Sequence, residues 1–191
     1  MDAKTHYSLL AVLIAGLVMA SAFGGQAQVW QPFSFRGNES YRYQINWQNG
    51  EENSAIYSLT ISQNDSGKYT VEYSTEIEAE ELSSELAFGY WGTYGPSLQY
   101  MFWNPMYEML FSQLELKVGE KMSYLDFGTM EVKGKENVAG FEGFVCELSD
   151  TDGEKTAEWV IDPEIALPLR SYMYEGNVDE GEVVLLDYET F

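Results

Sequence analysis

Hydrophobic and polar residues alternate with a period of two along much of the chain after residue 40. In the first such run, every second residue is aromatic or branched: Tyr41, Tyr43, Ile45 and Trp47. This alternation is typical of a β-strand with one buried face. Asn49-Gly50 follows the run, and this dipeptide favours a tight hairpin turn because both of its residues tolerate positive φ. The start of an antiparallel meander is therefore predicted here.

The same pattern predicts further short strands about ten residues apart. We expect them at 55–61, 69–77, 122–127, 130–133, 144–148, 157–161, 169–174 and 183–188. Glycine-containing turns are expected between the later strands, at Gly128, Gly134, Gly140, Asp152-Gly153 and Gly176-Asn177. Short strands at this spacing indicate a mainly β fold in which an antiparallel sheet curls into a barrel or sandwich.

One stretch, residues 97–111, departs from the strand pattern. Asn104 can cap a helix, Pro105 suits the first helical position, and Glu108 complements the positive end of the helix dipole. We therefore predict a short helix over 105–113. Its apolar residues surround nearly the whole circumference, so it should be enclosed by the rest of the protein.

The methionines and aromatic residues in and before this helix have two interpretations. They can fill the core of a small β protein, which is the common role of aromatic side chains. They can also line an apolar cavity, because methionine adapts its shape to variable guests. The candidate ligand-binding residues in the second interpretation are Tyr100, Phe102, Trp103, Met106, Met109 and Leu110. A third hypothesis is that the aromatic loop 88–94 forms an exposed platform for glycan or protein.

The N-terminal residues 1–27 have the three parts of a secretory signal peptide. A short polar start with Lys4 precedes an apolar run over 9–20, and small residues follow it. The apolar run is shorter than the roughly 20 residues that cross a bilayer, so no stable membrane span is expected once the leader is cleaved. We predict a single exported β-rich domain over 28–191, in the periplasm, the cell envelope or the extracellular space.

The formal net charge is −21, and loss of residues 1–27 leaves it unchanged because Asp2 and Lys4 go together. A field of this sign repels nucleic acids and anionic membrane surfaces. We therefore expect no nucleic-acid partner. The apolar-cavity interpretation makes an apolar or lipid-like ligand the expected partner. The sequence indicates no particular protein partner.

The sequence lacks the residues that several kinds of catalytic and metal site require. The one histidine, His6, lies in the predicted leader, so a cleaved protein has no histidine for triad catalysis or a zinc site. Cys146 is the only cysteine, and its alternation with Phe144 and Leu148 predicts a core position. The run 150–154 begins like a calcium loop but has Ile161 where a bidentate Glu is required. We expect no catalytic residues, no metal and no cofactor.

The C-terminal half resembles a known superfamily. It contains "EVKGKENVAG" and then "WVIDPEIALPLR", which match a G-x-E-x-V-x-G strand pair followed by a W-[IV]-D-x-x-x-x-[LP]-P-L-[RK] strand pair. The matching residues are Gly134, Glu136, Val138, Gly140, Trp159, Ile161, Asp162, Leu167, Pro168, Leu169 and Arg170. This layout, over about 114–191, resembles exported domains of unknown function related to the Lol-type lipoprotein carriers and to the mycobacterial and archaeal lipoprotein-carrier-like proteins.

The resemblance implies a strongly curved antiparallel sheet, a half-barrel or open barrel, with a short helix covering its concave face over a cavity for acyl chains. Arg170 then either pairs with an acid of the turn before it or marks a ligand carboxylate. The leading hypothesis is an exported, non-enzymatic domain that binds a hydrophobic or lipid-like ligand. The alternatives are a surface protein that binds glycan or protein, and a hydrolase that uses two carboxylates.

Overall fold

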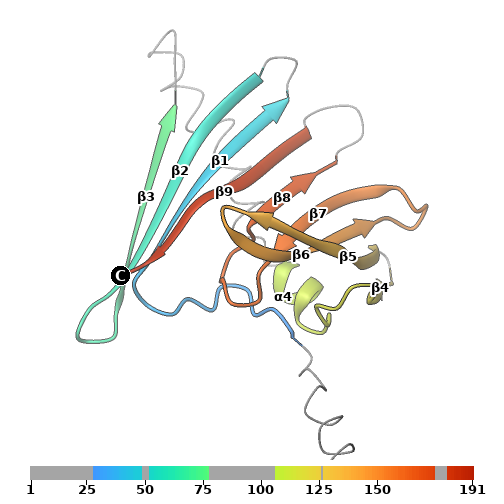
Figure 1. Ribbon diagram of the computed structural model, residues 1–191, viewed down its shortest axis with the longest axis horizontal. Helices are drawn as coiled ribbons and strands as arrows, with labels where there is room; N and C mark the ends of the chain where they lie inside the picture. Colours follow the sequence, from blue (N-terminus) through green and yellow to red (C-terminus); the bar gives the residue numbers. More distant parts are fainter. Residues whose placement is uncertain (1–27, 49–51, 78–105, 126, 175–179) are drawn as a thin grey trace, which may run out of the picture.

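The computed structural model describes residues 28–48, 52–77, 106–125, 127–174 and 180–191. Nine strands in these ranges form one antiparallel sheet in the spatial order β3-β2-β1-β9-β8-β7-β6-β5-β4 (Figure 1). The strands are β1 Glu39–Gln48, β2 Glu52–Gln63, β3 Tyr69–Ile77, β4 Lys121–Tyr124, β5 Gly128–Val138, β6 Phe141–Ser149, β7 Lys155–Ile161, β8 Arg170–Met173 and β9 Glu180–Thr190. The sheet bends strongly and stays open, with β3 and β4 at its two edges. This confirms the predicted half-barrel.

The period-two pattern separates an apolar face of the sheet from a more polar one. One row of register partners on the apolar face runs across the sheet from β5 to β2: Val132, Cys146, Trp159, Ser171, Val183, Ile45 and Ala55. The adjacent row has the opposite character and comprises Glu131, Glu147, Glu158, Tyr172, Glu182, Asn46 and Ser54. We call the apolar side the concave face and the other side the outer face.

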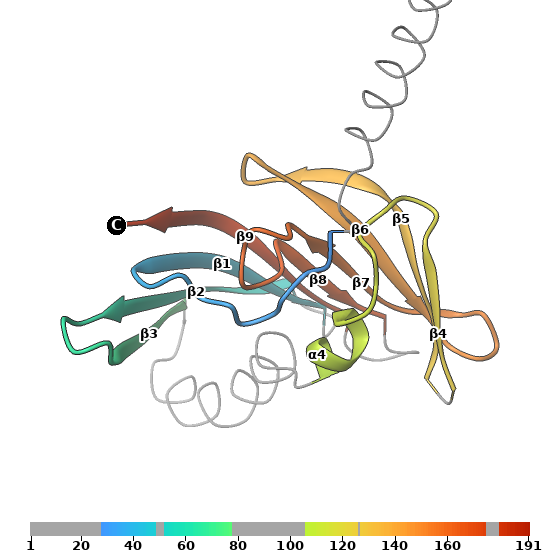
Figure 2. The ribbon, with the colours of Figure 1, turned by 90° about the horizontal axis from the view of Figure 1, so that it is seen from below.

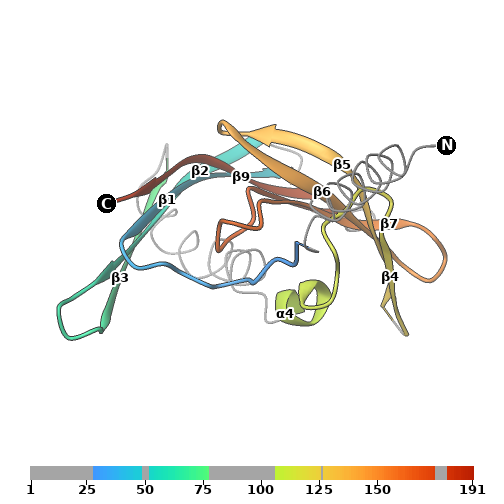
Figure 3. The same ribbon diagram turned by 60° about the horizontal axis from the view of Figure 1, so that its bottom comes forward.

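Within the described ranges, three segments cover the concave face: the short helix α4 (Met106–Phe111), residues 28–38 and the loop 162–168 (Figures 2 and 3). Residues 28–38 lie beside the loop, where Trp30 Nε1 donates to the Ile165 carbonyl at 2.7 Å and Phe33 N donates to the Ala166 carbonyl at 2.9 Å. From the sheet, Tyr43 OH donates to the Pro168 carbonyl at 2.9 Å. These hydrogen bonds satisfy buried polar groups, so they fix the cover in place.

The predicted helix is confirmed as an element that packs on the concave face, but one detail of it is wrong. Tyr107, Leu110 and Phe111 are buried, whereas Met109 is 44% exposed and Glu108 is exposed. A six-residue helix that lies on a sheet buries one side only, so its apolar circumference does not mean that it is enclosed all round. None of the helical turns in the described ranges is long and apolar enough to span a membrane.

A second prediction, the turn at Gly134, is also wrong. The β5 strand runs without interruption from Gly128 to Val138, and Gly134 lies at a bulge where the register to β6 shifts after Val132. Glycine in a strand interior often marks a bulge and not a strand end. The predicted turn at Gly140 is correct, and its φ of 89° lies in the region that favours glycine.

Candidate functional site

The six predicted ligand-binding residues divide into two groups. Tyr100, Phe102 and Trp103 lie outside the described residues, as does the aromatic loop 88–94. The other three belong to α4, where Met106 is half-buried, Met109 is exposed and Leu110 is 1% exposed. The helix therefore brings Met106 and Leu110 towards the concave face and turns Met109 away from it.

Aromatic rings fill the space directly between α4 and the sheet. Trp159 lies edge-to-face with Tyr107 and with Phe111, at centroid distances of 6.1 and 5.7 Å, and Trp30 lies edge-to-face with Phe111 at 5.1 Å. Trp159 Nε1 donates to Tyr107 OH at 3.2 Å, and Ser171 Oγ is 3.5 Å from the same oxygen. Burial raises the pKa of Tyr107 to about 12, although these two hydrogen bonds lower it in part. This contact is a packed core that holds the helix.

The apolar face is more exposed at the β3 end of the sheet. Tyr69, Val71 and Tyr73 are 53%, 40% and 54% exposed, although their register partners in β2 include the buried Leu59 and Ile61. The Tyr57 and Tyr73 rings, 6.1 Å apart, continue the aromatic surface from β2 to β3. An apolar surface that passes from a covered core to an exposed strand is a candidate contact surface for an apolar molecule.

A buried carboxylate lies at one end of this face. Glu39, 1% exposed, accepts hydrogen bonds from the Tyr41 hydroxyl and from the backbone N–H of Arg36. Burial, and next the hydrogen bond to Glu39, raise the pKa of Tyr41 well above its usual range, so Tyr41 stays a donor. The signal for this position was available, because Glu39 is in phase with Tyr41, Tyr43 and Ile45. Sequence reasoning began the strand two residues too late to include it.

Glu39 also lines an open polar cleft of about 290 Å³ at the end of the sheet. The cleft residues are Arg36, Gly37, Asn38, Glu39, Gln63, Thr190 and Phe191. The Arg36 guanidinium is paired with Glu164 at 2.5 Å, and the Asn38 side-chain oxygen accepts from Gln63 N at 2.8 Å. The polar groups of this cleft are thus largely committed to holding residues 36–38 against the strand ends.

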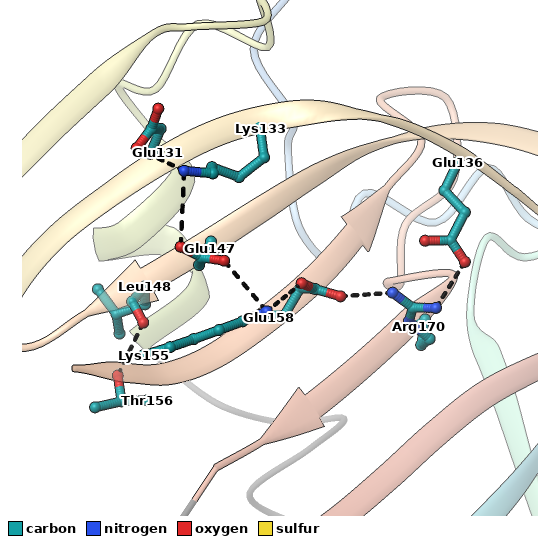
Figure 4. Close-up of polar contacts among 9 residues, drawn as sticks. All are labelled: Glu131, Lys133, Glu136, Glu147, Leu148, Lys155, Thr156, Glu158 and Arg170. Atoms are coloured by element: carbon teal, nitrogen blue, oxygen red, sulfur yellow. Dashed lines mark hydrogen bonds and ion pairs between the residues drawn. The ribbon is translucent and has the colours of Figure 1, made fainter. Parts of the chain in front are cut away.

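The outer face carries a ladder of alternating charges, which sequence reasoning missed. Glu131, Glu147 and Glu158 are direct neighbours on β5, β6 and β7 (Figure 4). Lys133 lies 3.1 Å from Glu131 and 3.9 Å from Glu147, and Lys155 lies 3.2 Å from Glu147 and 2.6 Å from Glu158. Cations between the carboxylates offset the repulsion that like charges on adjacent strands would otherwise exert.

Arg170 ends this ladder. Its two terminal nitrogens lie 2.5 Å from Glu158 and 2.6 Å from Glu136, so it joins β8 to β7 and β5 (Figure 4). Arg170 pairs with acidic residues, as predicted, but these acids lie on β5 and β7 and not in the turn before Arg170. Two carboxylates occupy the guanidinium, so a role in binding a ligand carboxylate has no support in this arrangement.

The ladder favours the ionised form of Glu158 and Glu131. Burial raises the pKa of Glu158, but the hydrogen bonds and charges of Lys155 and Arg170 outweigh burial and lower the pKa below its usual value. Hydrogen bonds from Lys121 and Lys133 lower the pKa of Glu131. A catalytic acid needs a raised pKa, so this arrangement suits ion pairing and not proton donation.

No protein-family model and no curated protein matches the chain. Among solved structures, one match is a MucB structure in complex with MucA(peri), at 11% identity and a TM-score of 0.40 over 82% of this chain and 51% of that chain. A second is the Pseudomonas aeruginosa MucA/MucB complex, at 12% identity and a TM-score of 0.41 over 81% and 52%. A third is a DUF1329 family protein from Desulfovibrio piger, at 11% identity and a TM-score of 0.25 over 83% and 87%.

The chain thus spans about half the length of the two MucB chains that it matches. The half-barrel fold rests on the nine-stranded sheet itself, and the resemblance of the sequence to lipoprotein-carrier-like proteins stays a prediction.

The structure places Cys146 in the core, as the alternation predicted. Its side chain is fully buried, and burial raises the pKa of the thiol to about 12. A buried thiol with a raised pKa is a poor nucleophile. Within the described ranges, no three His, Cys, Asp or Glu side chains converge as a metal site would require.

The acidic run 150–154 is a hairpin turn in the structure. The Asp150 side-chain oxygen accepts from the backbone N–H groups of Asp152 and Glu154, both at 2.9 Å. This confirms the interpretation of Asp152-Gly153 as a turn, in which Gly153 has a φ of 86°.

Proposed function

We propose that the protein is an exported, non-enzymatic domain that binds an apolar or lipid-like molecule on the concave face of its half-barrel. The observation that carries this proposal is the exposed apolar surface of β3, where Tyr69 and Val71 continue the buried face of β2. Elsewhere on this face, Trp30 and the α4 residue Phe111 pack against the sheet through aromatic rings. A ligand would therefore extend the apolar layer towards β3.

The size of this surface supports a binding role. The exposed parts of Tyr69, Val71 and Tyr73 amount to roughly 250 Å² of mostly apolar area, judged from the usual area of an aromatic side chain. Covering that area at about 25 cal/mol per Å² contributes about 6 kcal/mol before the costs of association. Exposed patches of a few hundred Å² are often functional in monomeric proteins.

The predicted export and the lack of any histidine after His6 complete the proposal. The sequence pattern of residues 1–27 is that of a cleaved leader, and mass spectrometry of the protein recovered outside the cytoplasm tests it directly. The expected mass is that of a chain lacking about 27 residues. A full-length mass in that fraction would contradict cleavage.

The binding test uses N-phenyl-1-naphthylamine, a neutral probe whose fluorescence rises in apolar surroundings. A neutral probe is required because a net charge of −21 would repel anionic fatty-acid probes. The purified protein should also release an apolar species on extraction with organic solvent. A protein that yields no such species and does not bind the probe overturns the proposal.

The variant Tyr69→Ser locates the site. Loss of about 60 Å² of contact at 25 cal/mol per Å² weakens probe binding by about tenfold. The matched control is Tyr172→Ser, since Tyr172 lies on the outer face between Glu158 and Glu182. Equal affinity in the two variants, both shown to be folded by circular dichroism, would contradict a site on the concave face.

A further inference from the structure

The two edges of the sheet differ in a way that the ligand proposal does not use. The β4 edge strand has four residues and begins with Lys121, whereas β3 has nine residues and pairs with β2 over its whole length without a register shift. Natural edge strands avoid unwanted pairing by being short, by bulges, by proline or by charged side chains, above all lysine. The β4 strand has such protection, whereas β3 is long, unbulged and free of proline and lysine, and its only charged side chains are Glu72 and Glu76.

The outer edge of β3 is available for pairing within the described part of the chain. The nine strands of the sheet end at β3, and each of the residues 69–76 is exposed. A strand edge presents alternating backbone N–H and C=O groups that another extended chain can pair with. Figure 1 shows β3 at the margin of the sheet, on the side away from β4.

The side chains of β3 define what kind of strand fits. Tyr69, Val71 and Tyr73 lie on the concave face of β3. The only charged residues of this strand, Glu72 and Glu76, lie on its outer face. A complementary strand would place apolar side chains next to the first set and basic side chains next to Glu72 and to Glu76, which already lies 3.8 Å from Arg42. Opposite-charge pairs and aromatic pairs across strands each contribute about 0.2 to 1 kcal/mol.

We propose that β3 accepts an extended segment of a partner protein as a tenth strand, and that this segment alternates apolar residues with lysine or arginine. The net charge of −21 favours such a partner, because it steers basic segments towards the protein. The same charge disfavours a second copy of this chain at the edge.

The test uses a fluorescein-labelled nonapeptide in which lysine alternates with valine and tyrosine, measured by fluorescence anisotropy at about 150 mM salt. Two control peptides replace each lysine by glutamate or place proline at two central positions. The proline peptide cannot form the ladder hydrogen bonds. Strand pairing predicts binding of the lysine peptide and at least tenfold weaker binding of both controls.

Two charge-reversal variants with the same change in net charge separate local pairing from general attraction. In Glu72→Lys with Glu76→Lys the reversed side chains lie on the edge strand. In Asp187→Lys with Glu189→Lys they are exposed on β9, an interior strand. The edge variant should lose at least tenfold in affinity for the lysine peptide and gain affinity for the glutamate peptide, while the β9 variant should change less than threefold. Equal losses in the two variants would refute a site at β3.

Hydrogen exchange of the backbone amides of β3 provides an independent readout. The lysine peptide should slow exchange in β3 and leave β4 unchanged. If the β3 amides are already as protected in the free protein as those of β1, another part of the chain occupies the edge and the proposal fails. Neither reversal touches the concave face, so N-phenyl-1-naphthylamine binding should be the same in both variants, and the ligand proposal is tested separately.

Discussion

Replacing Trp159 with alanine tests whether α4 is held by the aromatic contact beneath it. Trp159 is 2% exposed, and its ring contacts Tyr107 and Phe111 edge-to-face. Truncation removes the indole, leaves a cavity and takes the donor from Tyr107 OH. Buried Trp→Ala changes cost about 3 to 5 kcal/mol, and each lost aromatic pair accounts for about 0.5 to 1.5 kcal/mol of that.

The free energy of unfolding is measured by urea titration followed by far-ultraviolet circular dichroism. The variant should have a lower midpoint and an unchanged slope if the denatured state is unaffected. Trp159→Phe keeps a ring but loses the N–H donor, so it should cost less, about 1 to 2 kcal/mol. Tyr69→Ala provides the exposed aromatic control, with an expected loss under about 1 kcal/mol.

The result that would refute this reasoning is a loss of under about 1 kcal/mol in Trp159→Ala. Such a value is ordinary for exposed positions, and it would mean that the ring does not form part of the core. It would also remove the basis for treating α4 as a fixed part of the cover.

Three further predictions concern the ladder and the thiol. Arg170→Met should lower the free energy of unfolding by about 2 kcal/mol in the same urea assay, because Glu158 and Glu136 lose their shared cation, and no loss would mean that the pairs contribute nothing. The pKa of Glu158 is lower in the folded protein than its usual 4.5, so its ionisation stabilises the fold above pH 4.5, and this stabilisation is lost as the pH falls below 4.5. An acid titration should therefore lower the free energy of unfolding less in Arg170→Met than in the wild type. Cys146 should react with a thiol reagent such as Ellman's reagent only at the rate of unfolding, and rapid reaction in the native protein would contradict its burial.

The sequence predicts the strands well because one face of the sheet is buried along nearly its whole width. Tyr41, Tyr43 and Ile45 alternate with polar residues, and a one-residue slip would expose all of them, so the pattern determines the face. The cover of the concave face could not be predicted in the same way. Trp30, Phe33 and their neighbours have no period, because an irregular segment packs by tertiary contact alone.

The partners of Arg170 were also beyond sequence reasoning. Glu158 is 12 residues from it in the sequence and Glu136 is 34 residues from it, and both reach it only through the register of β5 to β8. The sequence offers many acids to one arginine. Strand pairing, which depends on the whole sheet, selects two of them.

The bulge at Gly134 explains how Glu136 reaches the outer face. Glu131 pairs with Glu147 on that face, and strict alternation from Glu131 would turn Glu136 towards the apolar side. The register shift after Val132 inserts one residue into β5, so Glu136 pairs with Gly143 and shares the outer face with Arg170. Val138, two residues beyond Glu136, lies on the same side of β5, where it is 6% exposed and belongs to the buried cluster that includes Val160 and Leu169. One extra residue therefore moves Glu136 and Val138 together to the side opposite the one that strict alternation would give them, and the strand continues for four residues past a glycine that resembles a turn signal.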